Sequence, residues 1–322
     1  MKTMKMSMVL FLIFCMIFSF SGCGSKPKKP STQEENAQKP MPKVIEEIEK
    51  DALKIMEQAD MIPYFQKIIV EKQIKEMESS AQQSNVDLSI SGSGENKLEV
   101  KADSSEKSEE DKPQSITIED SILSEILKKE KENSDEGQTE KPPKDIEETW
   151  KKINDLIKGL HGKWNVLEPQ LTPVNVPPEM IGQFEDTLNQ LTKFGFDKKY
   201  FETISTANNL TAHLPKFMTY YKYDIPPHVY TLKYHIRDIV LNASVGNFQA
   251  AQDSLDKFRE LSQGLKSELI KKKAQDVSDK LDASVTNLQN AIKNKDMLLL
   301  KINAGIVAKN VMLIKDALTG SM

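Results

Sequence analysis

Residues 150–167, WKKINDLIKGLHGKWNVL, decide the fold. Apolar side chains recur here at intervals of three and four residues, which places them on one face of an α-helix: Trp150, Ile153, Ile157, Leu160, Trp164 and Leu167. The same periodicity returns in later segments up to residue 320, and no stretch alternates apolar and polar residues as a half-buried strand would. The sequence therefore predicts an all-α fold, an elongated multi-helix bundle of roughly six or seven helices over residues 145–320.

Residues at the ends of these helices fit known start and stop signals. Pro226-Pro227 is expected to begin one helix, and Gly246-Asn247 to turn the chain into the next. Asp197 and Asp296 each precede an apolar helical pattern. We therefore expect their carboxylates to cap the helices that follow.

The last helix differs from the others because apolar residues lie on two of its faces. One face carries Leu299, Ile302, Ile306 and Leu313, and the other carries Leu300, Val307, Val311 and Ile314. A helix that is apolar on several sides is usually buried, so we expect this one to lie at the centre of the bundle.

Residues 1–22 have the three-part pattern of a secretory signal peptide. Lys2 and Lys5 give a positively charged start, residues 9–20 form an apolar run, and small residues follow. The apolar run is shorter than the ~20 residues that cross a bilayer as a helix. The pattern favours cleavage over a permanent membrane span.

The end of this segment, Phe20-Ser21-Gly22-Cys23, resembles a bacterial lipobox, with Phe20 in place of the usual leucine. The resemblance to bacterial lipoproteins implies that Cys23 receives a diacylglyceryl group and becomes the new N-terminus, which would hold the protein stably on the extracytoplasmic face of the cell membrane. The lysine-rich, cysteine-poor composition and Gly24 favour a Gram-positive cell. The alternative is an ordinary secretory signal with an incidental cysteine.

Between the signal segment and the bundle, the sequence predicts a largely disordered, partly helical region. Residues 23–43 contain lysine and proline with little apolar area, which is typical of a flexible tether. Residues 44–78 are predicted to form a helical arm, which either docks on the bundle or makes contacts of its own. Residues 79–144 form a low-complexity polar linker, with a short amphipathic helix near 117–131. This short helix either folds on a partner, packs on its own chain or stays disordered.

Composition and motifs exclude several function classes. With 44 basic and 48 acidic residues, the net charge of −4 argues against a nucleic-acid partner. Of the two cysteines, Cys15 lies in the segment expected to be removed and Cys23 is expected to carry lipid, which leaves no thiol for catalysis or metal binding. We find no catalytic motif and predict a protein that is not an enzyme and has no cofactor.

A candidate binding surface is rich in aromatic and histidine residues. Its members lie around the proline turns of residues 200–235: Tyr220, Tyr221, Tyr223, His228, Tyr230 and His235. Tyrosine offers both apolar area and a hydroxyl, which suits an interface, although the same rings could instead fill the end of the bundle. His228 and His235 are seven residues apart, about 10 Å along a helix, so we predict no metal bound between them.

Two functions remain for such a chain. The first is a membrane-anchored, extracytoplasmic lipoprotein whose bundle is a non-enzymatic interaction or structural module of the cell envelope, with an unknown envelope protein as partner. The second is a small-molecule or metal-binding bundle that uses the corner around residues 200–235.

Overall fold

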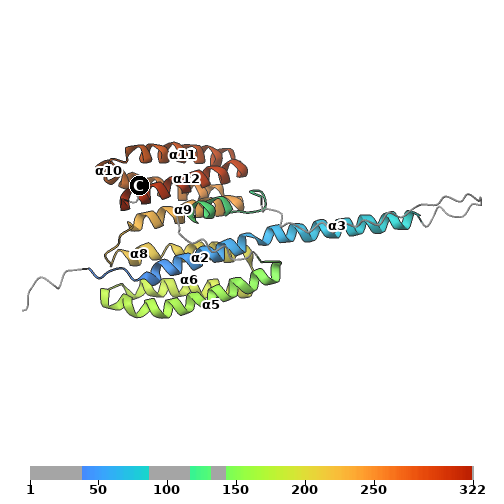
Figure 1. Ribbon diagram of the computed structural model, residues 1–322, viewed down its shortest axis with the longest axis horizontal. Helices are drawn as coiled ribbons and strands as arrows, with labels where there is room; N and C mark the ends of the chain where they lie inside the picture. The colour runs from blue at the N-terminus through green and yellow to red at the C-terminus, as the bar shows by residue number, and fades with distance from the viewer. Residues whose placement is uncertain (1–37, 87–116, 132–142, 321–322) are drawn as a thin grey trace, which may run out of the picture. The chain divides into compact units, whose positions relative to one another are not determined.

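The computed structural model describes residues 38–86, 117–131 and 143–320, with side chains for all but residues 79–86 (Figure 1). The predicted signal peptide, the lipobox with Cys23, most of the tether and most of the linker lie outside these residues. Within the described ranges the secondary structure is helical, with no strand. The prediction of an all-α, multi-helix bundle is confirmed.

One group of helices packs around the N-terminal helix α2 (Lys43–Asp60). This helix lies against α5 (Ile146–Leu171) and α7 (Tyr200–Thr211), and α6 (Pro178–Phe196) packs against both of these. The 3₁₀-helix η2 (Thr172–Val174) and the short α8 (Leu214–Met218) complete the group. Along α2, Ile45, Ile48 and Ile55 are fully buried. The sequence left open whether residues 44–78 dock on the bundle, and the structure places their first half in its core.

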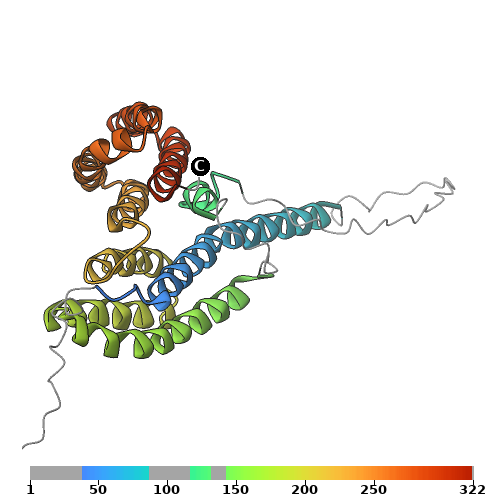
Figure 2. The ribbon, with the colours of Figure 1, turned by 60° about the vertical axis from the view of Figure 1, so that its left-hand side comes forward.

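A second group contains the last four helices, drawn in orange and red in Figure 2. They are α9 (Pro227–Ser244), α10 (Phe248–Lys271), α11 (Gln275–Asn294) and α12 (Met297–Thr319). Helix α9 packs against α10 and α12, and α11 packs against α12. As predicted, Pro226-Pro227 begins α9, Gly246 turns the chain with a φ of 78°, and Asp296 caps α12 by accepting from the Leu299 N–H.

One predicted cap is wrong. Asp197 ends α6, and α7 begins after Lys199, whose side chain makes no capping bond. The chain turns between these helices at Lys198, which has a φ of 54°. The turn therefore takes two residues more than the sequence pattern suggested.

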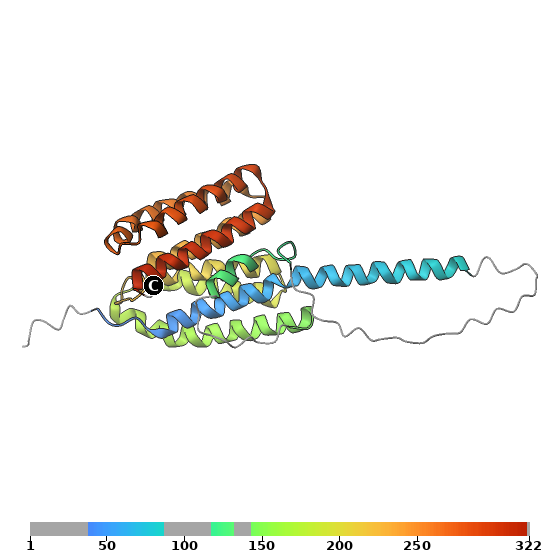
Figure 3. The ribbon, with the colours of Figure 1, turned by 45° about the horizontal axis from the view of Figure 1, so that its top comes forward.

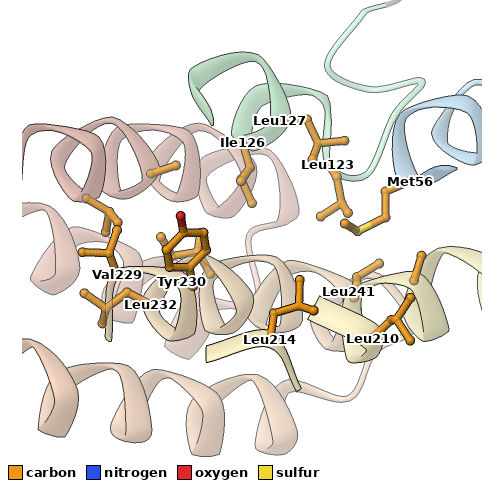
Figure 4. Packing of buried hydrophobic residues seen from close by; sticks show 14 of the residues in the cluster. Met56, Leu123, Ile126, Leu127, Leu210, Leu214, Val229, Tyr230, Leu232 and Leu241 are labelled. Atoms are coloured by element: carbon orange, nitrogen blue, oxygen red, sulfur yellow. The ribbon is translucent and has the colours of Figure 1, made fainter. Parts of the chain in front are cut away.

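The short helix α4 (Ser124–Lys131) lies between the two groups, which also meet directly where α7 and α8 contact α9. It packs against α12 of one group and α2 of the other. Leu123, Ile126 and Leu127 belong to the same apolar core as Met56, Tyr230 and Leu241 (Figure 4). The helix predicted near 117–131 therefore packs on its own chain, and the folded unit begins well before residue 145.

Only one apolar face of α12 is buried. Leu300, Val307 and Val311 are fully buried, as expected for a core helix. On the other face Leu299, Ile302 and Ile306 are 49%, 39% and 46% exposed. The helix thus lies at the edge of the second group, because α4, α9 and α11 cover only part of its circumference. It is also the one described helix long and apolar enough to cross a membrane, although half of that window is buried here.

Helix α3 (Ile62–Val86) extends beyond the neighbouring helices in Figures 1 and 3. Ile62 is buried, but every side chain from Gln66 to Glu78 is exposed. The exposed set includes five large apolar residues: Ile68, Ile69, Val70, Ile74 and Met77. The second half of the predicted arm therefore makes almost no contact with the described bundle.

Candidate functional site

The structure separates the six residues predicted to share a binding surface. Tyr221 is 2% exposed, and its hydroxyl donates to the Gln170 carbonyl at 2.8 Å. Tyr230 is also buried, which raises the pKa of its hydroxyl far above the ordinary value. Tyr220 packs partly buried against the core, whereas Tyr223 is exposed. The prediction of one shared surface is wrong for the buried pair, because their rings fill space between helices.

His228 and His235 do come together, in an open groove between α9 and α10. The groove has a volume of about 450 Å³ and is lined by His228, His235, Lys257, Glu260, Leu261, Gly264, Leu265 and Glu268. The α10 residues follow helical spacing over three turns, so they form one continuous wall. The histidines are two turns apart on α9 and form the opposite wall. Seven-residue spacing was the sequence signal that placed them on one face.

His235 is a buried group without a complete set of partners. His235 is 8% exposed, and its Nδ1 has no hydrogen-bond partner among the described residues. Burial, helped by the nearby Lys257 ammonium, lowers the pKa of the His235 imidazole to about 4. The ring is therefore neutral at pH 7, with one nitrogen able to donate and the other to accept.

The side chains of the groove are not grouped in a way that would coordinate a metal ion. Across the described ranges, no three histidine, cysteine, aspartate or glutamate side chains are grouped to hold a metal ion. The two glutamates and two histidines of the groove are spread along it instead of converging. The arrangement suits hydrogen bonding and charge pairing with an elongated molecule better than coordination of an ion.

A buried polar cluster under α4 was missed by the sequence analysis. Arg237 is fully buried on α9 and donates through Nη1 to both carboxylate oxygens of Glu130, at 2.7 and 2.6 Å. Its Nε donates to Asn208 Oδ1 at 2.8 Å, and its Nη2 to Thr211 Oγ1 at 3.0 Å. No local pattern reveals this cluster, because Glu130 lies among lysines in a stretch that reads as solvated.

Lys233 extends this cluster to α2. Its ammonium lies 2.6 Å from Glu49 Oε1 and 3.7 Å from Glu130 Oε2, and all three side chains are at most 11% exposed. Two cations and two carboxylates from α2, α4 and α9 are therefore balanced in one buried place. Such an arrangement fixes α4 in position.

The start of the α4 segment is held by Asp60, the last residue of α2. Its carboxylate accepts from the N–H groups of Ile122 and Leu123 at 2.6 and 2.8 Å. Burial raises the pKa of this carboxyl to about 6, although the two N–H groups and the Lys301 ammonium act in the opposite direction. Lys301 itself donates to the carbonyl oxygens of Ile118 and Ser121. The segment is thus fastened at both ends.

Aromatic residues of the first group pack together as core. Trp164 stacks on Phe184 with ring centroids 4.3 Å apart, and Phe217 lies 5.7 Å from Phe184. His213 meets the edge of Phe184 and bonds through Nε2 to Thr187 at 3.1 Å. This part of the corner around residues 200–235 therefore fills the bundle, and the α9–α10 groove is the candidate site.

The chain matches no protein-family model, no curated protein and no solved structure.

Proposed function

We propose that this protein is lipid-anchored on the extracytoplasmic face of the cell membrane, in a Gram-positive cell. There its helical bundle acts as a non-enzymatic interaction or structural module of the envelope. The observation that carries the proposal is the sequence Phe20-Ser21-Gly22-Cys23 behind a charged start and an apolar run. Two acyl chains on Cys23 give the stable attachment that one chain does not.

The exposed apolar residues of α3 support a role in interaction. Ile69, Val70 and Met77 are 46%, 52% and 64% exposed on a helix with little contact to the bundle. Contiguous apolar surface on a folded chain marks sites of contact with other proteins or with membranes. A tether of the composition seen before α2 would let such a helix reach a neighbouring envelope protein.

The anchor is tested by metabolic labelling with palmitate and by membrane fractionation of cells expressing the full chain. Cys23→Ala should abolish the label and release the protein from membranes. Cys15→Ala is the matched control, because it makes the same change in the segment expected to be removed, and it should keep both label and attachment. A membrane-bound Cys23→Ala protein, or loss of label in both variants, would overturn the anchor.

The interaction role is tested in intact cells with a photo-crosslinking residue placed at Ile74, and separately at the exposed Lys158 on α5. A defined crosslinked product with an envelope protein from position 74 alone supports the role. Equal crosslinking from both positions, or none from position 74, contradicts it.

A further inference from the structure

Three charged side chains line the α9–α10 groove: Lys257, Glu260 and Glu268. No hydrogen bond or ion pair joins the side chains of Lys257, Glu260 or Glu268 to another residue in the described ranges. On the same helix, Lys266 does form an ion pair, with Asp282 at 2.6 Å. Lys257 interacts electrostatically with Asp238 on α9 without a direct contact, so its donors, like the two glutamate carboxylates, are available to a bound molecule.

The groove has a lysine at one end and a glutamate at the other, with a second glutamate, Glu260, one turn from the lysine. Lys257 lies beside His235, whose pKa it influences, and Glu268 lies eleven residues further along α10. Eleven residues of helix correspond to about 16 Å, and Glu260 lies between the two ends. A complementary molecule is therefore elongated, with its negative group at Lys257 and its positive group toward Glu268.

The middle of the groove suits a polar backbone lying over an apolar floor. Leu265 is buried and Leu261 partly buried, while Gly264 leaves open space where a side chain would stand. The neutral His235 ring can donate and accept hydrogen bonds, and its Nδ1 has no partner among the described residues. Peptide groups, which also donate and accept, match this lining.

We propose that the α9–α10 groove binds a short peptide-like molecule that carries a free carboxylate at the Lys257 end and a free ammonium at the Glu268 end. An extended peptide of four residues spans about 13 Å, which fits between the two charged ends. The site goes beyond the proposed function, since it depends on neither the lipid anchor nor the α3 helix.

The probe is tetraalanine, tested on the full chain with isotope-labelled histidine by NMR. The chain has four histidines, and two of them report on other places: His161 is bonded to Thr192 and His213 to Thr187. At about 10 mM peptide, enough to saturate a site with a Kd of about 1 mM, the signals of His228 and His235 should shift. Shifts at all four histidines, or at none, would overturn the proposal.

The ends of the peptide are tested by blocking them. N-acetylation and C-terminal amidation should each weaken binding at least about fivefold, as expected for loss of one charge-assisted pair. Glu268→Gln should weaken binding of the free peptide by a similar factor and leave that of the acetylated peptide unchanged. Lys257→Met should likewise weaken binding of the free peptide and leave binding of the amidated peptide unchanged. A diamine of similar length that binds as tightly as the peptide would contradict the carboxylate requirement.

Gly264→Leu tests the groove itself without changing charge. The substitution fills the open space, and leucine is favourable in an exposed helix, so the fold should be kept while binding is lost. Lys271→Gln is the matched control, on the same helix but outside the lining, and should bind like the unchanged chain. Unaltered binding by Gly264→Leu would place the peptide elsewhere.

Discussion

Arg237 and Glu130 are 107 positions apart in the sequence, yet Nη1 of Arg237 lies within 2.7 Å of both carboxylate oxygens of Glu130. Both side chains are almost completely buried, at 0% and 1% exposed. Removing two charges from water carries a large desolvation penalty, which is offset only when the pair is close and its remaining donors are satisfied. Asn208 and Thr211 supply those acceptors. The pair therefore decides where α4 sits.

We expect Glu130→Gln to destabilise the protein strongly, by about 3–5 kcal/mol, because it leaves the Arg237 charge buried without a counter-charge. Urea denaturation of the full chain measures the change in the free energy of unfolding. Asp155→Asn, which breaks an exposed ion pair with Lys158, is the control and should change it by less than about 1 kcal/mol. A loss below about 1 kcal/mol for Glu130→Gln would show that α4 is not held by this pair.

The position of α2 is tested by comparing two isoleucines on neighbouring helices. Ile55 is fully buried in α2, and Ile69 is 46% exposed in α3. Ile55→Ala should lower the free energy of unfolding by about 2–5 kcal/mol, whereas Ile69→Ala should change it by about 0.5 kcal/mol or less. Thermal and urea unfolding both report this. Equal effects would mean that α2 does not belong to the core.

Two positions on α12, two residues apart, test which of its apolar faces is covered. Leu300→Ala removes a fully buried side chain and should cost about 2–5 kcal/mol. Ile302→Ala removes one that is 39% exposed and should have a much smaller effect. The same urea denaturation measures both. A large effect at Ile302 would indicate that another surface covers this face in solution.

Asp60 should make stability depend on pH in the mildly acidic range. Its folded-state pKa of about 6 lies above the unfolded value of 3.8, so folding favours the protonated carboxyl. Its contribution is fully present below about pH 4 and is lost as the pH rises through about 6. The free energy of unfolding of the unchanged chain, minus that of Asp60→Asn, should fall by roughly 2.4 kcal/mol between about pH 4 and 7.

The hydrogen bond that asparagine loses at position 60 adds only a constant offset to this difference, because it does not titrate. The other titrating groups are common to both proteins and cancel. A difference that stays flat across the range would contradict the raised pKa of Asp60.

His213 and His235 should make stability depend on pH in the opposite direction to Asp60. Burial lowers the pKa of each imidazole to about 4, below the usual 6.5. The unfolded chain therefore binds protons more readily, and the stability from these two rings is present above about pH 6.5 and lost as the pH falls toward about 4. NMR titration of the four histidine rings should show two that remain neutral at pH 5.5. Normal titration of either ring would contradict its burial.

The fold class was predictable because burial follows a local period. All six residues of the opening stripe, from Trp150 to Leu167, are buried. The same reasoning identified α2 as a helix but could not place it, because its neighbours α5 and α7 are more than 80 residues away in the sequence. On α12 it found two apolar faces and could not tell which one would be covered.

The candidate site was predictable only where spacing alone determines geometry. His228 and His235 share a groove because two turns of one helix bring them to one side. Tyr221 and Tyr230 belong to the same tyrosine-rich segment, yet they are buried, since the helices packed against them decide their exposure. Glu130 could not be recognised at all, because its environment is created by residues on α2, α7 and α9.

The fastening of α4 also bears on the order in which the protein folds. Lys233 bonds to Glu49 across 184 positions, and Lys301 bonds to the carbonyl of Ser121 across 180. Contacts between such distant positions require closure of long loops, whereas the α9–α10 and α11–α12 hairpins form from local contacts. We therefore expect the hairpins to assemble early and α4 to dock late. The ion pairs that hold α4 would then act mainly by slowing unfolding, so they contribute to the kinetic stability of the fold.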